Sequence, residues 1–263
     1  MIEIANARVT YGRKMEKPAI DRVNLLANDG ERIIIVGSNG SGKTTLLRLL
    51  LGLVKAESGS VKVFGKNVAK IDGEVRVSTN LSEVYAIINT SVRDIIRIYS
   101  EMKGGEPSEP LNMVRTFGLD GILDRKIFQL STGQRRMVAN ILALSFSPSL
   151  VLLDEPFDNI DQGTRIRLLK MLNNFNGGVV LNTHELDILN RLGDWTLYFM
   201  IEGKLIGKFY ANQLKNLFLN KGDVLGSLAV LETSFGTFSI TENSGQVPMA
   251  NIRALDSMFD EVA

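Results

Sequence analysis

The clearest chemical pattern in the sequence is a glycine-rich loop that matches the P-loop pattern at every fixed position. The loop consists of Gly37, Ser38, Asn39, Gly40, Ser41, Gly42, Lys43 and Thr44. Its glycines let the backbone curl so that successive N–H groups point at an anion, next to the N-terminus of a helix. Lys43 can supply positive charge to the β- and γ-phosphates, and the Thr44 hydroxyl can bind Mg²⁺. We therefore expect this loop, together with Thr45, to bind a nucleoside triphosphate.

An acidic pair, Asp154-Glu155, follows the short apolar run 150–153. Ligands gather at the carboxyl ends of buried parallel strands, so these two side chains are expected beside the P-loop. Asp154 is predicted to hold Mg²⁺, through water. Glu155 is predicted to orient or deprotonate an attacking water molecule, so the chemistry indicated is hydrolysis of the terminal phosphate.

The elements that must position these groups alternate between strand and helix patterns. Strand patterns cover 1–30, 32–36, 58–79, 150–153, 178–181 and 195–210, the last as a hairpin around Glu202-Gly203. Helical patterns run from the P-loop to about 52, and over 81–130 with a loop at 103–110, 133–144, 162–175 and 211–219. Strands joined by helices favour an α/β P-loop fold with a mainly parallel sheet, plus an antiparallel β subdomain.

The domain organisation predicted from these patterns has two parts. Residues 1–220 form the nucleotide-binding domain, with a helical subdomain at about 81–130. Residues 221–263 form a small C-terminal extension of short strands that ends in a helix at about 252–262. The tail serves regulation, dimer contact or simple packing; the sequence leaves these open.

The composition is that of a soluble protein and excludes several kinds of function. The 263 residues carry 30 basic and 29 acidic side chains, a net charge of +1, so there is no electrostatic footprint for nucleic acid. The chain has no cysteine, which excludes a disulfide framework, a cysteine nucleophile and a thiolate metal site. Its apolar runs are far shorter than the roughly 18 residues that a membrane helix needs.

A short motif, Leu130-Ser131-Thr132-Gly133-Gln134, begins the pattern of the helix at 133–144. It resembles the LSGGQ signature of the ATP-binding subunits of ATP-binding cassette (ABC) transporters, with threonine in place of the first glycine. Together with the P-loop and the acidic pair, this resemblance covers about residues 1–215. Single-cassette subunits of this size resemble both vitamin and metal-ion importers, of the cobalt or energy-coupling-factor type, and drug or polysaccharide exporters. The substrate and the direction of transport therefore stay open.

The resemblance implies roles for further residues. Tyr11 matches the aromatic residue that stacks on adenine, and His184, the only histidine, matches the switch histidine that touches the γ-phosphate. Asp161 matches the aspartate of the loop that crosses the dimer seam, although Asp158 stands at that loop's usual serine position.

The resemblance also implies partners. In the family two subunits pair head to tail, and Ser131, Gly133 and Gln134 of one copy close over the γ-phosphate held by Lys43 of the other. The chain is then a homo- or heterodimeric ATPase on the cytoplasmic face of the membrane, bound to integral membrane subunits. Candidate residues for the docking groove and core of the helical subdomain are Tyr85, Ile87, Ile88, Ile95, Ile96 and Ile98. A soluble ABC ATPase without a transport role, and a regulatory cassette that barely hydrolyses ATP, remain the alternatives.

One position departs from the family pattern. Asn80 stands where the family has a glutamine that reaches Mg²⁺ or the attacking water. Asparagine offers the same carboxamide group but is one methylene shorter. We expect Asn80 to do the same work through a shorter contact or a water molecule.

Overall fold

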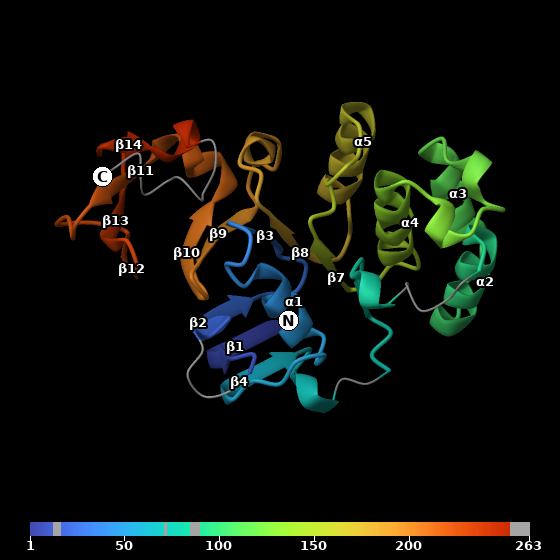
Figure 1. Cartoon of the computed structure of the whole chain (residues 1–263), viewed down its shortest axis with the longest axis horizontal. Coiled ribbons are helices and arrows are strands. Elements are labelled where there is room, and N and C mark those ends of the chain that lie inside the picture. The colour runs from blue at the N-terminus through green and yellow to red at the C-terminus, as the bar shows by residue number, and fades with distance from the viewer. Residues whose placement is uncertain (13–16, 71–72, 85–89, 253–263) are drawn as a thin grey trace. The chain divides into compact units, whose positions relative to one another are not determined.

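The computed structural model describes residues 1–12, 17–70, 73–84 and 90–252 (Figure 1). The chain divides into two compact units. The first consists of Met1–Asp72 and Asn182–Ala263, and the second of Gly73–Leu181. Within the described residues, no helix is both long enough and apolar enough to cross a membrane.

The first unit contains an antiparallel sheet with the strand order β2-β1-β4-β5. Its strands are β1 (Ile2–Val9), β2 (Ile20–Ala27), β4 (Ser58–Val63) and β5 (Lys66–Asn67). Alternation of buried and exposed residues is clear in β1, where Ile2 and Ile4 are buried and Glu3 is exposed. The predicted antiparallel β region at the N-terminus is therefore confirmed.

The strand that leads into the P-loop is β3 (Arg32–Gly37), and helix α1 (Lys43–Leu50) follows the loop. β3 pairs in parallel with β9 (Thr196–Ile201), which pairs antiparallel with β10 (Lys204–Tyr210). The four apolar residues 33–36 of β3 are each 0% exposed, as expected for a strand covered on both faces. This buried strand fixes the position at which the P-loop begins.

A separate antiparallel sheet of the same unit, with the order β12-β13-β11-β14, begins at Leu217 and contains most of the described part of the predicted C-terminal extension. Its strands are β11 (Leu217–Lys221), β12 (Ala229–Thr233), β13 (Gly236–Glu242) and β14 (Val247–Pro248). The short helix predicted near 211–219 is present as a 3₁₀ helix but is shorter: it covers Ala211–Asn216, and Leu217 begins β11. Pairing of β11 with β13 buries Leu217 and Leu219 and overrides the helical pattern. The helix predicted over 252–262 falls almost wholly outside the described residues.

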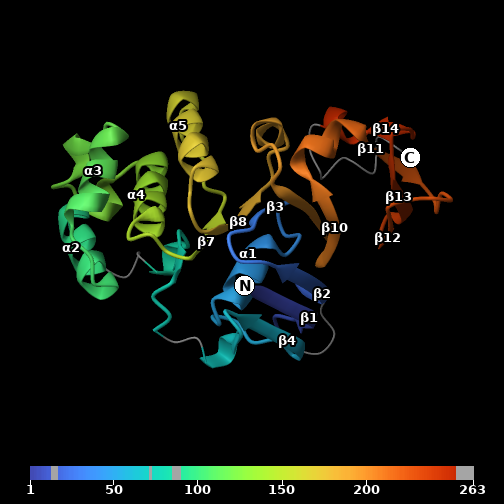
Figure 2. The ribbon, with the colours of Figure 1, turned by 180° about the vertical axis from the view of Figure 1, so that it is seen from behind.

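The second unit contains the parallel pair β6 (Val77–Thr79) and β7 (Leu150–Asp154). After them β8 (Gly178–Thr183) carries the chain back into the first unit. The helices of this unit are α2 (Val92–Lys103), α3 (Ser108–Thr116), α4 (Thr132–Leu144) and α5 (Gln162–Asn173). α2, α3 and α4 lie side by side in both views of the ribbon (Figures 1 and 2). α2 and α3 fall within residues 81–130, for which a helical subdomain is predicted, and α4 follows that region.

The loop predicted at 103–110 is shorter in the structure. α2 begins after Ser91, whose hydroxyl accepts a hydrogen bond from the Asp94 N–H, and it ends at Gly104 in the left-handed conformation. α3 already begins at Ser108. Glycine at the end of one helix and proline before the next set these limits. Ile95 and Ile96 are buried, whereas Tyr85, Ile87 and Ile88 lie outside the described residues.

Seven short 3₁₀ helices complete the described elements. They are Val68–Lys70, Ser82–Val84, Asp120–Ile122, Ile127–Gln129, Asp187–Arg191, Ala211–Asn216 and Met249–Asn251.

Candidate nucleotide-binding site

The P-loop joins the end of β3 to the first turn of α1. Lys43, the first residue of the helix, is 5% exposed. Its ammonium donates hydrogen bonds to the carbonyl oxygens of Gly37, at 2.7 Å, and Ser38, at 2.9 Å. The loop therefore folds around the amine that is predicted to bind the β- and γ-phosphates. Thr45 is buried, and Thr44 is half-buried.

Two glycines of the loop are required by the backbone. Gly42, the N-cap of α1, has φ 110°, and a Cβ there would collide with the carbonyl oxygen of Ala19. A Cβ at Gly37 would collide with the carbonyl oxygen of Met200 on β9. The loop can therefore keep this path only with glycine at both positions.

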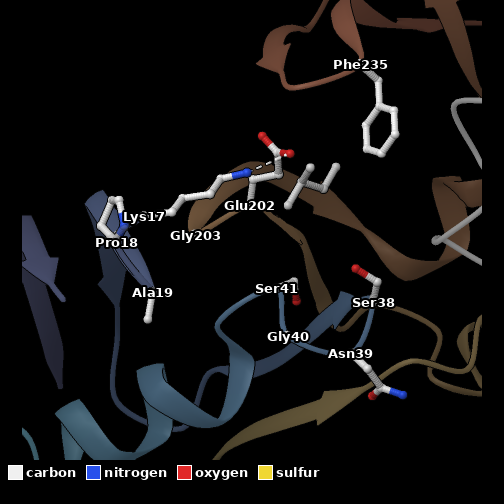
Figure 3. A pocket seen from close by; sticks show the side chains of 11 residues that line it. Lys17, Pro18, Ala19, Ser38, Asn39, Gly40, Ser41, Glu202, Gly203 and Phe235 are labelled. Carbon is white, nitrogen blue, oxygen red and sulfur yellow. Dashed lines mark ion pairs between the residues drawn. The ribbon is translucent and has the colours of Figure 1, made fainter. Parts of the chain in front are cut away.

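A cavity of about 440 Å³ lies against the P-loop (Figure 3). Its lining residues come from four parts of the first unit: the segment before β2, the P-loop, the β9–β10 turn and the C-terminal extension. They are Lys17, Pro18, Ala19, Ser38, Asn39, Gly40, Ser41, Ile201, Glu202, Gly203 and Phe235. This volume is within the range of cofactor sites.

The acidic pair lies at the end of β7 in the second unit. The four residues 150–153 are each 0% exposed, whereas Asp154 and Glu155 are half-buried. Glu155 has φ 44°, so the chain turns sharply as it leaves the strand. Both carboxylates thus follow a fully buried strand, as predicted.

A hydrogen-bond network holds the end of β7, and Asn80 is its centre. Asn80 is 1% exposed, and its amide oxygen accepts from the Asp154 N–H at 2.7 Å. Its amide nitrogen donates to the Asp154 carbonyl, at 3.1 Å, and to Asn140 Oδ1, at 2.8 Å. Asn140, on α4, in turn donates to the Pro156 carbonyl at 2.8 Å. Asn80 therefore positions the backbone that carries the acidic pair, and its contact with Mg²⁺ stays a prediction.

We expect Asn80→Ala to destabilise the protein by about 1–3 kcal/mol and to lower the rate of ATP hydrolysis. The change leaves buried polar groups of Asp154 and Asn140 without their partner and loosens the acidic pair. Thermal or urea unfolding and phosphate release measure the two effects. Asn174→Ala, at an exposed position, should stay within about 0.5 kcal/mol of the wild type. Equal stability of the two variants would contradict the role of Asn80.

The signature motif forms the N-terminus of α4. Ser131 is the N-cap: its hydroxyl accepts from the Gln134 N–H at 3.2 Å, and the Gln134 side chain accepts from the Ser131 N–H at 3.0 Å. This capping box gives Ser131 and Gln134 a structural role within the single chain, because each satisfies a backbone N–H at the start of the helix. Gly133 approaches the backbone of Asn159 so closely that a Cβ would collide with its carbonyl oxygen. The exposed Thr132 fits at the first helical position.

Asp161 is the N-cap of α5. Its carboxylate accepts from the Thr164 N–H at 3.0 Å. The side-chain and then the backbone hydrogen bond of Thr164 lower the pKa of Asp161 below its usual value of 3.8. The predicted role of Asp161 at a dimer seam stays a prediction, whereas its role as a helix cap is visible in the single chain.

We expect Asp161→Ala to lower the melting temperature of the nucleotide-free protein at pH 7, because α5 loses its cap. Since the folded-state pKa is depressed, the ionised cap stabilises the protein above the unfolded-state pKa, and this is lost as the pH falls through the folded-state pKa. Asp161→Asn keeps a neutral cap. The advantage of wild type over Asp161→Asn should therefore shrink when melting is followed from pH 7 to pH 3. A pH-independent difference would contradict this.

Two further predicted residues follow strands of the first unit. Tyr11 follows β1 and is 46% exposed, and His184 follows β8 and is exposed. Both belong to the first unit together with the P-loop. Their contacts with adenine and with the γ-phosphate stay predictions.

Two residues of α4 that support the site were not predicted. Arg136 donates to the Asp154 carbonyl at 3.0 Å, and Asn140 holds both Asn80 and the Pro156 carbonyl. Asn140 left a signal in the sequence, because it is a polar residue within the apolar run of 137–144. Arg136 left none. A P-loop with a buried lysine, together with an acidic pair at the end of a buried strand, defines a P-loop nucleoside triphosphatase.

Comparisons with known proteins agree with this class. Residues 20–158 match the family model described as ABC transporter. A candidate ABC transporter ATP-binding protein of Archaeoglobus fulgidus is 31% identical over 217 residues, which are 79% of this chain and 91% of that protein. The taurine import ATP-binding protein TauB of Escherichia coli (strain 536) is 35% identical over 195 residues, 71% of this chain and 74% of that protein.

Among solved structures, that of a candidate cobalt transport ATP-binding protein (cbiO-2) covers 100% of both chains, with a TM-score of 0.90 and 35% identity. The chain therefore belongs to the ABC transporter family, as an ATP-binding subunit that hydrolyses ATP. The predicted family, fold class and enzymatic activity are confirmed. Two proteins of the same fold with solved structures form assemblies: the ATP-binding cassette MJ0796 (23% identical, TM-score 0.72) is dimeric, and cbiO1 of Clostridium perfringens (21% identical, TM-score 0.61) is part of the complex cbiONQ.

Proposed function

We propose that this chain drives the uptake of a small solute through separate membrane subunits, by closing and opening as a dimer around ATP and Mg²⁺. Relatives named for taurine import and cobalt transport support transport as the function. The chain works at the cytoplasmic face of the membrane, where its helical region contacts the membrane subunits.

The observation that carries the dimer is that one chain has one P-loop and one signature motif. Ser131 and Thr132, at the N-terminus of α4, are both exposed and can face a second copy. A helix N-terminus stabilises negative charge. The γ-phosphate held by Lys43 of one copy is then capped by α4 of the other copy, and hydrolysis removes the group that joins them.

Each predicted residue has a role in this cycle. Lys43, Thr44 and the other P-loop residues bind the phosphates, and Tyr11 stacks on the adenine. Thr44 and Asp154 hold Mg²⁺, which screens the phosphate charge. Their hydroxyl and carboxylate oxygens are ligands that Mg²⁺ prefers. Glu155 acts on the attacking water and His184 contacts the γ-phosphate.

Light scattering in ATP without Mg²⁺ tests the dimer. We expect the wild type to shift from monomer to dimer. Ser131→Arg should remain monomeric while still binding ATP, because a bulky cation replaces the exposed N-cap. Asn174→Arg, an exposed change at the C-terminal end of α5, should dimerise normally. Dimerisation of Ser131→Arg with wild-type dependence on ATP would refute the proposed interface.

The membrane partner has its own test. Phosphate release should rise when the purified chain meets liposomes that contain its membrane subunits, and it should stay unchanged with empty liposomes. A rate that never responds to the membrane subunits would favour a cassette without a transport role.

A further inference from the structure

One aromatic residue of the C-terminal extension lines the P-loop cavity. Phe235 lies in the turn between β12 and β13, and it lines the same cavity as Ser38 and Ser41 although almost 200 positions separate them. Its side chain is 64% exposed. In Figure 3 the ring extends from the ribbon of the extension toward the P-loop residues. The phenyl ring is thus part of the wall of this cavity.

Hydrogen bonds from the β9–β10 turn hold the β12–β13 turn in this place. The carboxylate of Glu202 accepts from the Ser234 N–H, at 3.0 Å, and from the Ser234 hydroxyl. Lys204 donates from its ammonium to the Glu232 carbonyl at 2.8 Å. Phe235 therefore follows a residue that is anchored through both its backbone and its side chain.

The same β9–β10 turn is bonded to the P-loop. The Gly203 N–H donates to the Ser41 carbonyl at 2.9 Å, and the Gly203 carbonyl accepts from the Asp21 N–H at 2.8 Å. Glycine is required there, since φ is 81° and a Cβ would lie 3.0 Å from the Pro18 carbonyl oxygen. A short path of hydrogen bonds thus connects the P-loop to the extension through residues 202 and 203.

An ion pair connects the β9–β10 turn to the segment before β2. Lys17 Nζ lies 2.9 Å from the Glu202 carboxylate, as the dashed line in Figure 3 marks. Burial opposes ionisation of Glu202, but hydrogen bonds from Lys17 and Ser234 outweigh it and lower the pKa of that carboxyl. Glu202 is therefore charged at neutral pH, and the hydrogen bonds that anchor the turn have an ionised acceptor.

We propose that Phe235 is a nucleoside-binding residue, and that the β12–β13 turn of the C-terminal extension is a wall of the nucleotide site. This inference rests on the proposed binding of phosphates by the P-loop. The phosphates bind the loop, and the nucleoside then lies in the adjoining cavity, where the ring of Phe235 packs against it. Packing on an aromatic face stabilises any base, so the contact contributes affinity for the nucleoside part of the ligand.

Calorimetric titration of the whole chain with two ligands separates the parts of the site. ADP carries the nucleoside, whereas pyrophosphate carries only the phosphates. We expect Phe235→Ala to weaken ADP binding by about tenfold, which is the scale of one base–aromatic contact, and to leave pyrophosphate binding within about twofold of wild type. Val230→Ala, on β12 of the same hairpin and 46% exposed, should change neither.

Two results of these titrations would overturn the inference about Phe235, and a third would refute the P-loop proposal as well. ADP binding by Phe235→Ala at wild-type affinity would overturn the inference, and so would an equal loss for both ligands, which indicates a disturbed loop. A wild type that binds neither ligand would refute the P-loop proposal itself, and this inference with it.

Fluorescence gives a second test that does not depend on affinity. In Phe235→Trp we expect the emission to change when ADP is added but not when pyrophosphate is added. The only native tryptophan, Trp195, is 1% exposed, and wild type supplies its background signal. No response to ADP in a variant that binds ADP would overturn the inference.

Discussion

Glu155→Gln should lower the turnover of ATP by about 10²- to 10⁴-fold, the range that a positioned general base contributes. Glutamine has nearly the shape of glutamate, so the half-buried side chain after β7 keeps its place. It cannot accept a proton from the attacking water. ATP affinity should be retained, since the variant also removes a negative charge from the neighbourhood of the phosphates.

Phosphate release measures this effect, and light scattering measures its consequence. Because the γ-phosphate is not removed, the variant should accumulate as an ATP-bound dimer even with Mg²⁺ present. Glu106→Gln, an exposed position before α3, is the matched control and should turn over ATP like the wild type. A Glu155→Gln protein that hydrolyses ATP normally would show that another group activates the water.

Lys43→Met should weaken ATP binding by roughly 10- to 100-fold and reduce hydrolysis at least as much. Methionine is unbranched like lysine and only one atom shorter, but it has no donor and no charge, so the charge-assisted contact with the phosphates is lost. The carbonyls of Gly37 and Ser38 also lose their donor in the empty loop. Both losses act on the same few residues, and they should not be additive.

Calorimetry with ATP measures the change, and unfolding in the absence of nucleotide tests whether the loop survives it. Lys55→Met, at an exposed position of the same unit, should bind ATP like the wild type. If Lys43→Met binds ATP with wild-type affinity, the phosphates are held by some other part of the chain.

The two anchors of the site were predictable because each is local in sequence. The P-loop joins a buried strand to a helix within a few residues. Its glycines stand at fixed positions where a side chain would collide with a neighbour or strain the backbone, so the pattern is recognisable in the sequence. Asp154 and Glu155 follow a fully apolar strand for the same kind of reason. The capping box of Ser131 and Gln134 is likewise a pattern over four residues.

The contacts of Asn80 could not be predicted from a local pattern. The sequence indicated its place after a strand and its carboxamide chemistry, but its partners lie 60 and 74 positions away at Asn140 and Asp154. Only the packing of α4 against β6 and β7 brings the three residues together. The helix predicted over 211–219 ends early for a related reason: the residues from Leu217 onward pair with a strand more than 15 residues farther along the chain.

The sequence by itself therefore determined the local structures on which the proposed chemistry depends: a nucleotide loop, an acidic pair at a strand end and a signature helix, since short patterns impose these through local backbone geometry. The tertiary structure alone decided which residues support and complete them. It placed Asn80 behind the acidic pair, and it brought Phe235 of the extension to the P-loop cavity through the Glu202-Gly203 turn. Such contacts join segments that only the pairing and packing of whole strands brings together, and no local pattern encodes them.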